Sequence, residues 1–507
     1  MTDAPAPRAY DALERRFARL AAIEDALGIL HWDAETMMPA AAEAGRSDQL
    51  ATLEAIAHDT LTAPDTGDLL DAAAADEALL DPWRRANLRE MRRRYLHAAA
   101  VPADLVEANA RAVFRSEMVW REARAASDFA LLRPHLSEVL SLQRQVGEAK
   151  GAALGLSPYD ALLDSYDPGL RRATIDPVFA RLRAGLPELI AEARAAQERL
   201  PAAVPLDGPF PVAVQKALGE ALMRAVGFDF ARGRLDVSLH PFCGGATEDV
   251  RITTRYDEGG FIQALMGVLH ESGHALYEQG RPPEWRRQPV GAARGMSLHE
   301  SQSLLLEMQA ARSPEFLAYL APLVADAFGR NGPAWTPQNL HRLMTRVEPG
   351  FIRVEADEVT YPAHILLRYE LETAMIAGDL AVGDLPGAFN AGMAELLGLE
   401  VPNDRLGCLQ DIHWPGGSFG YFPTYTLGAM MAAQLFEAAC RAEPKIPADL
   451  GKGDFARLVS WLRQSVHGKA SLLTTEELLV AATGRPLDAD TFRSHLRRRY
   501  IEGAGAP

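Results

Sequence analysis

Hydrophobic residues recur every three or four positions along most of this chain, which is the spacing of an amphipathic helix. Alanine, leucine, arginine and glutamate dominate the long stretches, and all four are strong helix formers. In residues 8–30, one helical face would carry Tyr10, Leu13, Phe17, Leu20, Ile23 and Leu27. The same pattern predicts further helices at about 43–62, 67–80, 82–99, 101–125, 127–153, 171–200, 258–280, 296–311, 316–329, 336–348, 354–377, 384–397, 426–441, 452–467 and 474–482.

Residues 234–256 have a different pattern. Polar and apolar residues alternate there, and β-branched residues are frequent, which predicts short strands or a hairpin. Residues 201–211, PAAVPLDGPFP, read as a proline-rich connection. We therefore expect a mainly α-helical protein with one small β-sheet, directly before the helix at 258–280.

Length and charge restrict the function classes. On average 507 residues correspond to about three domains, although large helical enzymes spend as much on one body. Hydrophobic residues at 48% and charged residues at 24% are ordinary globular usage, which excludes collagen-like and mostly disordered chains. The net charge is −16, whereas non-specific binding to nucleic acids or anionic membranes needs a basic face. We expect neither nucleic acid nor membrane as a partner.

Cysteine usage and the absence of long apolar runs indicate the compartment. Cys243, Cys408 and Cys440 form no CxxC pair, which is typical of reduced thiols rather than of a disulfide framework. The first 20 residues carry charges where a signal peptide needs an apolar core. No apolar run reaches the roughly 18 residues of a transmembrane helix. The sequence therefore predicts a cytoplasmic protein.

The predicted helix at 258–280 contains an HExxH motif, His270-Glu271-Ser272-Gly273-His274. Residues four apart lie on one face of a helix, so both imidazoles can reach one metal ion at about 2.0–2.1 Å, as zinc requires. Glu271 is rotated by about 100° from His270, where it can accept a proton from a metal-bound water. The motif alone predicts a zinc hydrolase.

A catalytic zinc needs a third protein ligand. The extended motif HExxHxxGxxH is absent, because Tyr277 and Gly280 occupy its last two positions. A glutamate on a following helix is the other solution. Glu300 lies 26 residues after His274, and His299 and Glu307 compete for the same role. A glutamate on a helix is usually a solvated charge, so spacing leaves the choice open.

Several segments, in order along residues 32–428, resemble the carboxypeptidase Taq family of zinc metallocarboxypeptidases. They are WDAETMMP at 32–39, HPF at 240–242, DVRIT at 249–253, HESGH at 270–274, HESQ at 299–302, IRVEADEVTY at 352–361, GCLQDIHW at 407–414 and GYFPTYTLG at 420–428. Five of these segments, HPF, DVRIT, HESGH, HESQ and GCLQDIHW, match the family's motifs in the right order, which is far more specific than one HExxH. Residues 1–30 and 440–507 carry no such motif.

The resemblance implies a single catalytic domain over 1–507, with a helical N-terminal portion at about 8–200 and a zinc-site portion at about 234–430. It implies a helical body with a deep active-site groove and a small sheet beside the zinc helix. It also implies zinc, a homodimer, and removal of single C-terminal residues from peptides with broad preference. By the same match Glu300 becomes the third zinc ligand. Co²⁺ suits the same ligands and could substitute.

The expected reaction is peptide hydrolysis, with Glu271 taking the proton of the attacking water and passing it to the leaving amine. The tetrahedral oxyanion needs a donor beside the metal. His413 and Tyr421 are the candidates, and Tyr425 competes for the tyrosine role. Each could instead be a core-packing side chain.

An exopeptidase also needs a cation for the terminal carboxylate, and arginine can pair with both carboxylate oxygens. Arg353, supported partly by the resemblance, is the first choice. Arg251 is the rival, although Asp249 two residues away favours a structural ion pair. His240 and Gln410 would line or brace the groove.

Three other functions were weighed. Residues 416–420, GGSFG, fit the GxSxG pattern of serine hydrolases, but Pro415 and Pro423 disfavour the strand and helix that this elbow requires. A helical scaffold with a degenerate site would not need an intact HExxH. The nearer alternative is a zinc oligopeptidase or dipeptidyl carboxypeptidase of similar helical build, which would lack the HPF, DxRxT and GxxQDxHW set.

Overall fold

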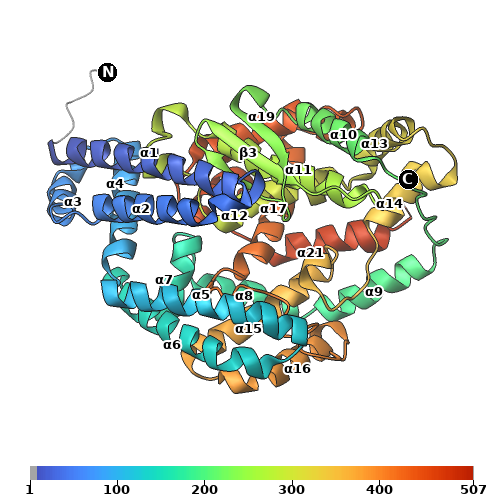
Figure 1. The fold of residues 1–507 in the computed structure, drawn as a ribbon. Coiled ribbons are helices and arrows are strands. Elements are labelled where there is room, and N and C mark those ends of the chain that lie inside the picture. Colours follow the sequence, from blue (N-terminus) through green and yellow to red (C-terminus); the bar gives the residue numbers. More distant parts are fainter. Residues whose placement is uncertain (1–7, 506–507) are drawn as a thin grey trace.

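The computed structural model describes residues 8–505, which fold into helices around one small sheet (Figure 1). Residues 1–7, included in the argument against a signal peptide, lie outside the described part. The N-terminal half contains α1 (Arg8–Thr36), α2 (Glu43–Leu61), α3 (Thr66–Ala75), α4 (Pro82–Ala99), α5 (Ala103–Ala126), α6 (Phe129–Leu154), α7 (Pro158–Tyr166), α8 (Arg172–Arg183), α9 (Leu186–Glu198) and α10 (Val212–Ala225). After the strands follow α11 (Ile262–Gly280), α12 (Met296–Leu304), α13 (Pro314–Ala327), α14 (Pro337–Met344), α15 (Tyr361–Ala377), α16 (Leu385–Leu397), α17 (Pro423–Ala442), α18 (Ile446–Leu450), α19 (Ala456–Ser465), α20 (Thr475–Thr483) and α21 (Ala489–Arg497).

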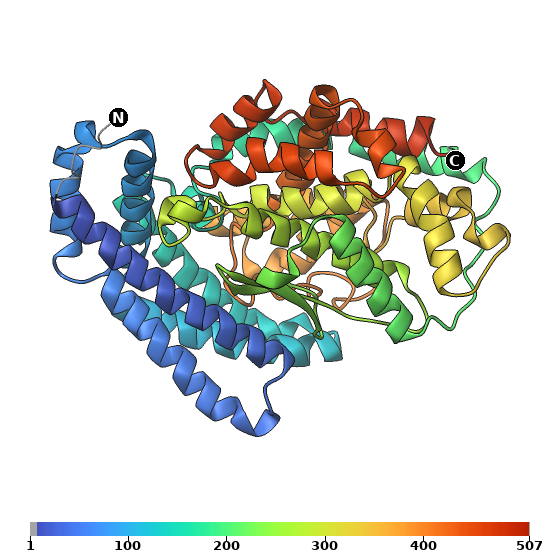
Figure 2. The same cartoon turned by 90° about the horizontal axis from the view of Figure 1, so that it is seen from above.

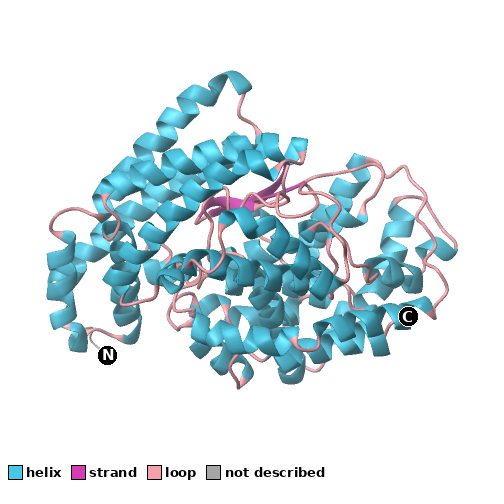
Figure 3. Ribbon diagram, turned by 90° about the horizontal axis from the view of Figure 1, so that it is seen from below, coloured by secondary structure: helices cyan, strands magenta, loops and turns pink. Residues whose placement is uncertain are grey.

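The three strands are β1 (Gly233–Val237), β2 (Cys243–Ala246) and β3 (Asp249–Thr254), in the order β1-β3-β2. β3 runs parallel to β1 and antiparallel to β2. Val250 and Ile252 of β3 are buried against Val268 and Ala275 of α11. The sheet therefore covers one side of α11, and Figure 3 shows the magenta strands enclosed among helices. The prediction of a mainly α-helical protein with a small sheet beside the HExxH helix is confirmed.

The N-terminal helices have their own hydrophobic core. Tyr10, Leu13, Phe17 and Leu20 of α1 pack with residues of α3 and α4. α2, described in full, has no buried residue and packs along α1. Seen from above, the blue N-terminal helices lie along one side of the molecule, the red C-terminal helices along another, and the strands with α11 between them (Figure 2).

Two glycines allow α11 and α17 to approach α12 closely, one at the backbone of Gln302 and the other at the side chain of Glu300. A Cβ added at Gly273 of α11 would lie 2.3 Å from the carbonyl oxygen of Gln302 in α12. One added at Gly428 of α17 would lie 2.7 Å from Cβ of Glu300. Any side chain at either position would push α11, α12 and α17 apart, so these glycines fix their separation.

Most predicted helices are present, with informative differences. The single helix predicted at 171–200 is two, α8 and α9, because Gly185 and Pro187 interrupt it. The helix predicted from 354 starts at Tyr361, with Pro362 in its first turn. The prediction missed α7, α10, α18 and α21. The expected helix at 296–311 changes at Leu305 into a π-helical segment that ends at Ala310.

Within residues 8–505, no helix is both long and apolar enough to cross a bilayer. All three cysteines are free thiols.

Candidate metal centre

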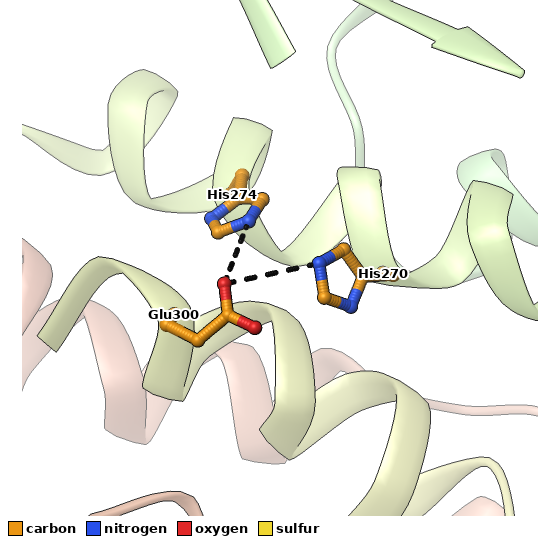
Figure 4. Close-up of side chains that lie close together, drawn as sticks. All are labelled: His270, His274 and Glu300. Carbon is orange, nitrogen blue, oxygen red and sulfur yellow. Dashed lines mark ion pairs between the residues drawn. The ribbon is translucent and has the colours of Figure 1, made fainter. Parts of the chain in front are cut away.

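α11 presents His270 and His274 on one face, toward α12 (Figure 4). Twelve residues of α11 are buried, so the helix is fixed on several sides and the histidines project from a rigid element. Both imidazoles face Glu300, which α12 contributes. Their Nε2 atoms lie 3.9 Å (His270) and 3.5 Å (His274) from Oε2 of Glu300.

These three side chains have the spacing of metal ligands. One ligand atom from each lies within 4.8 Å of the other two. Two atoms bound at about 2.0–2.1 Å to one ion at the tetrahedral angle would be roughly 3.3 Å apart. The two N···O distances of 3.9 and 3.5 Å are longer than this by about 0.6 and 0.2 Å. Two nitrogens and one oxygen gathered this closely suit a divalent cation.

Glu307 lies behind His270. Its Oε2 is 2.9 Å from Nδ1 of His270, and its other oxygen accepts from Arg312 at 2.8 Å. A carboxylate at Nδ1 holds the proton there and leaves the Nε2 lone pair for a metal. Glu307, one of the three candidates for third ligand, therefore orients a histidine in this structure.

His299 lies behind His274 in the same way. Its Nδ1 is 2.6 Å from Nδ1 of His274, and its Nε2 is 3.0 Å from Glu278, which pairs with Arg281 at 2.8 Å. If His274 donates from Nδ1, His299 accepts and then donates to Glu278. The chain thus ends in a carboxylate, as behind His270.

The charges within the site favour a cation. Burial disfavours the charged form of His270, but Glu300 and Glu307 outweigh it and raise the pKa of His270 to about 10. Burial alone would raise the pKa of Glu300, but His270 and His274 lower it to about 2. Glu300 therefore carries its negative charge throughout the neutral range.

Glu271, next to His270, is 6% exposed. Burial raises the pKa of its carboxyl to about 7. A carboxyl with a pKa near the working pH can both accept and return a proton. Glu271 thus has the properties expected of a general base.

A second cluster, of His413, Tyr421 and Tyr425, adjoins the three ligands. Nε2 of His413 lies 3.3 Å from the hydroxyl of Tyr425, while its buried Nδ1 has no hydrogen-bond partner among residues 8–505. Burial lowers the pKa of His413 to about 4, so the ring is neutral at pH 7. A cavity of about 250 Å³ borders all three side chains, together with Glu117 of α5. Burial raises the pKa of both tyrosine hydroxyls, and the negative charge of Glu300 adds to this effect.

Arg353 belongs to a buried cluster with Asp411 and Arg368. Nε and Nη2 of Arg353 donate to Oδ1 of Asp411 at 2.9 and 2.8 Å, and Nη1 donates to the Tyr361 hydroxyl at 2.7 Å. Arg368 holds Oδ2 of Asp411 at 2.7 Å. Two arginines thus share one carboxylate, which leaves one uncompensated positive charge. Arg353 still has two of its five N–H donors free of these contacts.

The sequence analysis missed Arg368 and Asp411. The sequence does indicate Arg368: it directly follows the mostly apolar segment AHILL of α15, and a buried charge requires a partner. Gln410 has a bracing role, since Oε1 accepts from the Arg353 backbone at 2.8 Å and Nε2 donates to Phe351.

The remaining candidates lie on the sheet side of α11. His240 is exposed in the connection between β1 and β2. Arg251 of β3 pairs with Asp249 at 3.0 Å, and its guanidinium lies 4.3 Å from the ring centre of Trp32. Neither joins the cluster around His413. Residues 415–421 form turns before α17, without the strand that a serine-hydrolase elbow requires.

Comparisons with known proteins identify the family of this chain. The family model described as carboxypeptidase Taq (M32) metallopeptidase matches residues 12–500. Thermostable carboxypeptidase 1 of Thermus thermophilus is 38% identical over 495 residues, which cover 96% of this chain and 97% of the relative. Carboxypeptidase 1 of Bacillus subtilis is 32% identical over 483 residues, covering 95% and 96%.

Solved structures give the same result. Metallocarboxypeptidase 1 of Trypanosoma cruzi superposes with a TM-score of 0.95 at 42% identity, covering 97% of this chain and 99% of that one. The M32 carboxypeptidase of Deinococcus radiodurans R1 superposes with a TM-score of 0.92 at 36% identity, covering 99% and 100%. The resemblance noted in the sequence motifs is confirmed.

Proposed function

Because the chain belongs to the carboxypeptidase Taq (M32) family and is a metallocarboxypeptidase, we propose that it uses one zinc ion to release single residues of broad type from peptide C-termini. The observation that carries this proposal is the group of His270, His274 and Glu300, whose ligand atoms lie within 4.8 Å of one another. Two imidazoles and one carboxylate are a ligand set typical of catalytic zinc. Cobalt could occupy the same ligands.

When bound, zinc acts as a Lewis acid and lowers the pKa of a coordinated water to about 7. Glu271, adjacent to His270 on α11, takes the proton of the attacking water. It then returns the proton to the leaving amine. Neutral His413 with Tyr421, or Tyr425 in its place, supplies hydrogen bonds to the developing oxyanion.

Arg353 is the proposed partner of the substrate's terminal carboxylate. The Arg353–Asp411–Arg368 cluster has one positive charge in excess, and one added carboxylate would neutralise it. Arg251, already paired with Asp249, remains the second candidate. His240 and Gln410 are proposed to line and brace this end of the site.

A peptide panel tests the proposal. The purified holoenzyme is given matched peptides with free and amidated C-termini, and product masses are followed over time with and without a chelator. Losing a buried charge pair costs about 2 kcal/mol or more, so amidation should lower kcat/KM by roughly thirty-fold. Single residues should leave in sequence, and the chelator should stop the release.

Arg353→Ala should lose activity on the free acid and most of its discrimination against the amide. Arg346→Ala is the matched control, because Arg346 is exposed and lies seven residues before Arg353. Loss of residues in pairs would indicate a dipeptidyl carboxypeptidase. Cleavage of amidated peptides at internal bonds would indicate an oligopeptidase and remove Arg353 from the mechanism.

We further propose that the protein acts on peptides as a homodimeric cytoplasmic enzyme with one catalytic domain. These points rest on the family resemblance and on the reduced cysteines.

A further inference from the structure

A second polar cavity shares no lining residue with the metal ligands or with the cavity beside His413. Its volume is about 560 Å³, and it is bordered by α4, α6, α7 and the loop 289–293. Its polar lining consists of the two carboxylates Glu24 and Glu90 and of six hydrogen-bond donors, Arg93, Arg94, His97, Lys150, Ser165 and Ser471. Donors therefore outnumber carboxylates in this cavity, although the chain as a whole has a net charge of −16.

The ion pairs around this cavity contain more cations than anions. Arg94 pairs with Glu24, Arg93 with both Glu90 and Asp164, and Arg171 with Asp164. Glu90 is shared further with Arg89 and Arg294. Five arginines thus share three carboxylates around the cavity; of these arginines Arg93 and Arg94 line it, together with Lys150. Two further acids, Asp167 and Glu477, form no ion pair with these cations within the described part of the chain.

Of these cations, Lys150 has the least compensating negative charge beside it. Its Nζ donates to the Ser165 hydroxyl at 3.0 Å, and no carboxylate of residues 8–505 lies within 4.0 Å of it. Burial lowers the pKa of this ammonium, Asp164 partly opposes that, and Arg93 adds to it. The neighbouring His97 adds no negative charge, and its Nε2 lies 2.9 Å from Asp164, so it shares that carboxylate with the arginines.

We propose that this cavity binds a phosphate group, free or carried by a small molecule, with Lys150 and the neighbouring arginines as donors. A half-buried ammonium without a carboxylate partner, beside arginines, favours an oxyanion with several acceptor oxygens. The cavity is larger than one phosphate needs, so a phosphate monoester also fits. Ala293, which lines the cavity, lies three residues before α12, the helix that carries Glu300. The cavity shares no lining residue with the metal ligands.

Calorimetric titration of the holoenzyme with inorganic phosphate and with glycerol 2-phosphate, against sodium chloride at equal ionic strength, tests this. Wild-type protein should bind one phosphate group per chain. Lys150→Met should weaken binding at least about ten-fold, or about 1.4 kcal/mol, and Lys150→Arg should restore much of it. Lys216→Met is the matched control, because Lys216 is exposed on α10.

Phosphate can also bind an open metal site, but that signal would be the same in all three variants. The proposal is therefore read from the difference between Lys150→Met and Lys216→Met. Binding of the monoester alone would identify an organic phosphate as the ligand, and binding of both would identify the phosphate group itself. No binding, or equal affinity in these two variants, would overturn the proposal.

Discussion

At the scale of single residues, each proposed ligand histidine is held by a contact to the ring nitrogen that faces away from the metal position. Glu307 contacts Nδ1 of His270, and His299 contacts Nδ1 of His274. Each contact fixes a tautomer, and both continue to a charged pair. Ligand and supporting residue should therefore differ in their effect on metal affinity.

Glu300→Ala should abolish stoichiometric metal binding, because an open site with three protein ligands cannot spare one. Glu307→Gln should retain metal but bind it about 10–100-fold more weakly, which is the usual effect of losing a group that orients a ligand. Metal content after dialysis against graded chelator measures both. If Glu307→Gln were metal-free and Glu300→Ala loaded, the two assignments would have to be exchanged.

Glu271→Gln should keep its metal and lose turnover by about 10²–10⁴-fold, since the amide has nearly the same shape but cannot take a proton. Steady-state kinetics on an unblocked peptide, with metal content measured on the same sample, provide the check. His270→Ala is the contrasting variant and should lose metal and activity together. Near wild-type turnover in Glu271→Gln would exclude it as the base.

At the scale of elements, the spacing of apolar residues predicted most helices, because it shows which face of each helix is buried. It could not choose between Glu300 and Glu307. Seven residues apart on a regular helix, the two would share a face, but the chain becomes π-helical at Leu305, which rotates later side chains about the axis. It also could not reveal the Arg353–Asp411–Arg368 cluster, whose members come from separate segments.

α4 and α7 are joined through one buried acid, Asp164, which accepts from Arg171 at 2.6 Å, His97 at 2.9 Å and the Gly169 backbone at 3.0 Å. Burial opposes its ionisation, but these partners hold the pKa of Asp164 well below its usual range. Its contribution to stability is therefore present above its unfolded pKa of about 3.9 and is lost as pH falls through the folded value.

Asp164→Asn should lower the free energy of unfolding at pH 7 by about 3–5 kcal/mol, because it leaves buried cations without their partner. The difference from wild type should shrink as pH falls below about 4, where Asp164 takes up a proton in the unfolded chain. Between pH 5 and 7 the variant also changes the titration of His97, because burial lowers the pKa of that imidazole and Asp164 opposes this effect. Denaturant unfolding at each pH measures the difference. Asp71→Asn, which breaks an exposed pair with Arg92, should change stability by less than about 1 kcal/mol throughout. If the difference grew as pH fell below about 4, Asp164 would not be the ionised partner of these cations.

At the scale of the whole molecule, the metal position joins α11 to α12 in the centre of the body, while the N-terminal helices keep a core of their own. An ion that binds only the folded chain stabilises it by about 4 kcal/mol at a thousand times its Kd. Removing the metal with a chelator should therefore lower Tm by a few degrees, since the unfolding entropy of so long a chain is large. In Glu300→Ala the chelator should leave Tm unchanged, and an equal shift there would mean that it acts elsewhere.

The contacts at Gly273 and Gly428 also bear on how this enzyme can change over time. At Gly273 the missing side chain lets α11 meet the backbone of α12, and at Gly428 it lets α17 meet the side chain of Glu300, so both contacts help to set the position of Glu300. A substitution at either glycine would displace this residue directly, whereas mutations elsewhere in the core reach it only through the packing of these helices. The fold can therefore vary at its periphery more freely than at these two positions, where a residue without a side chain is needed.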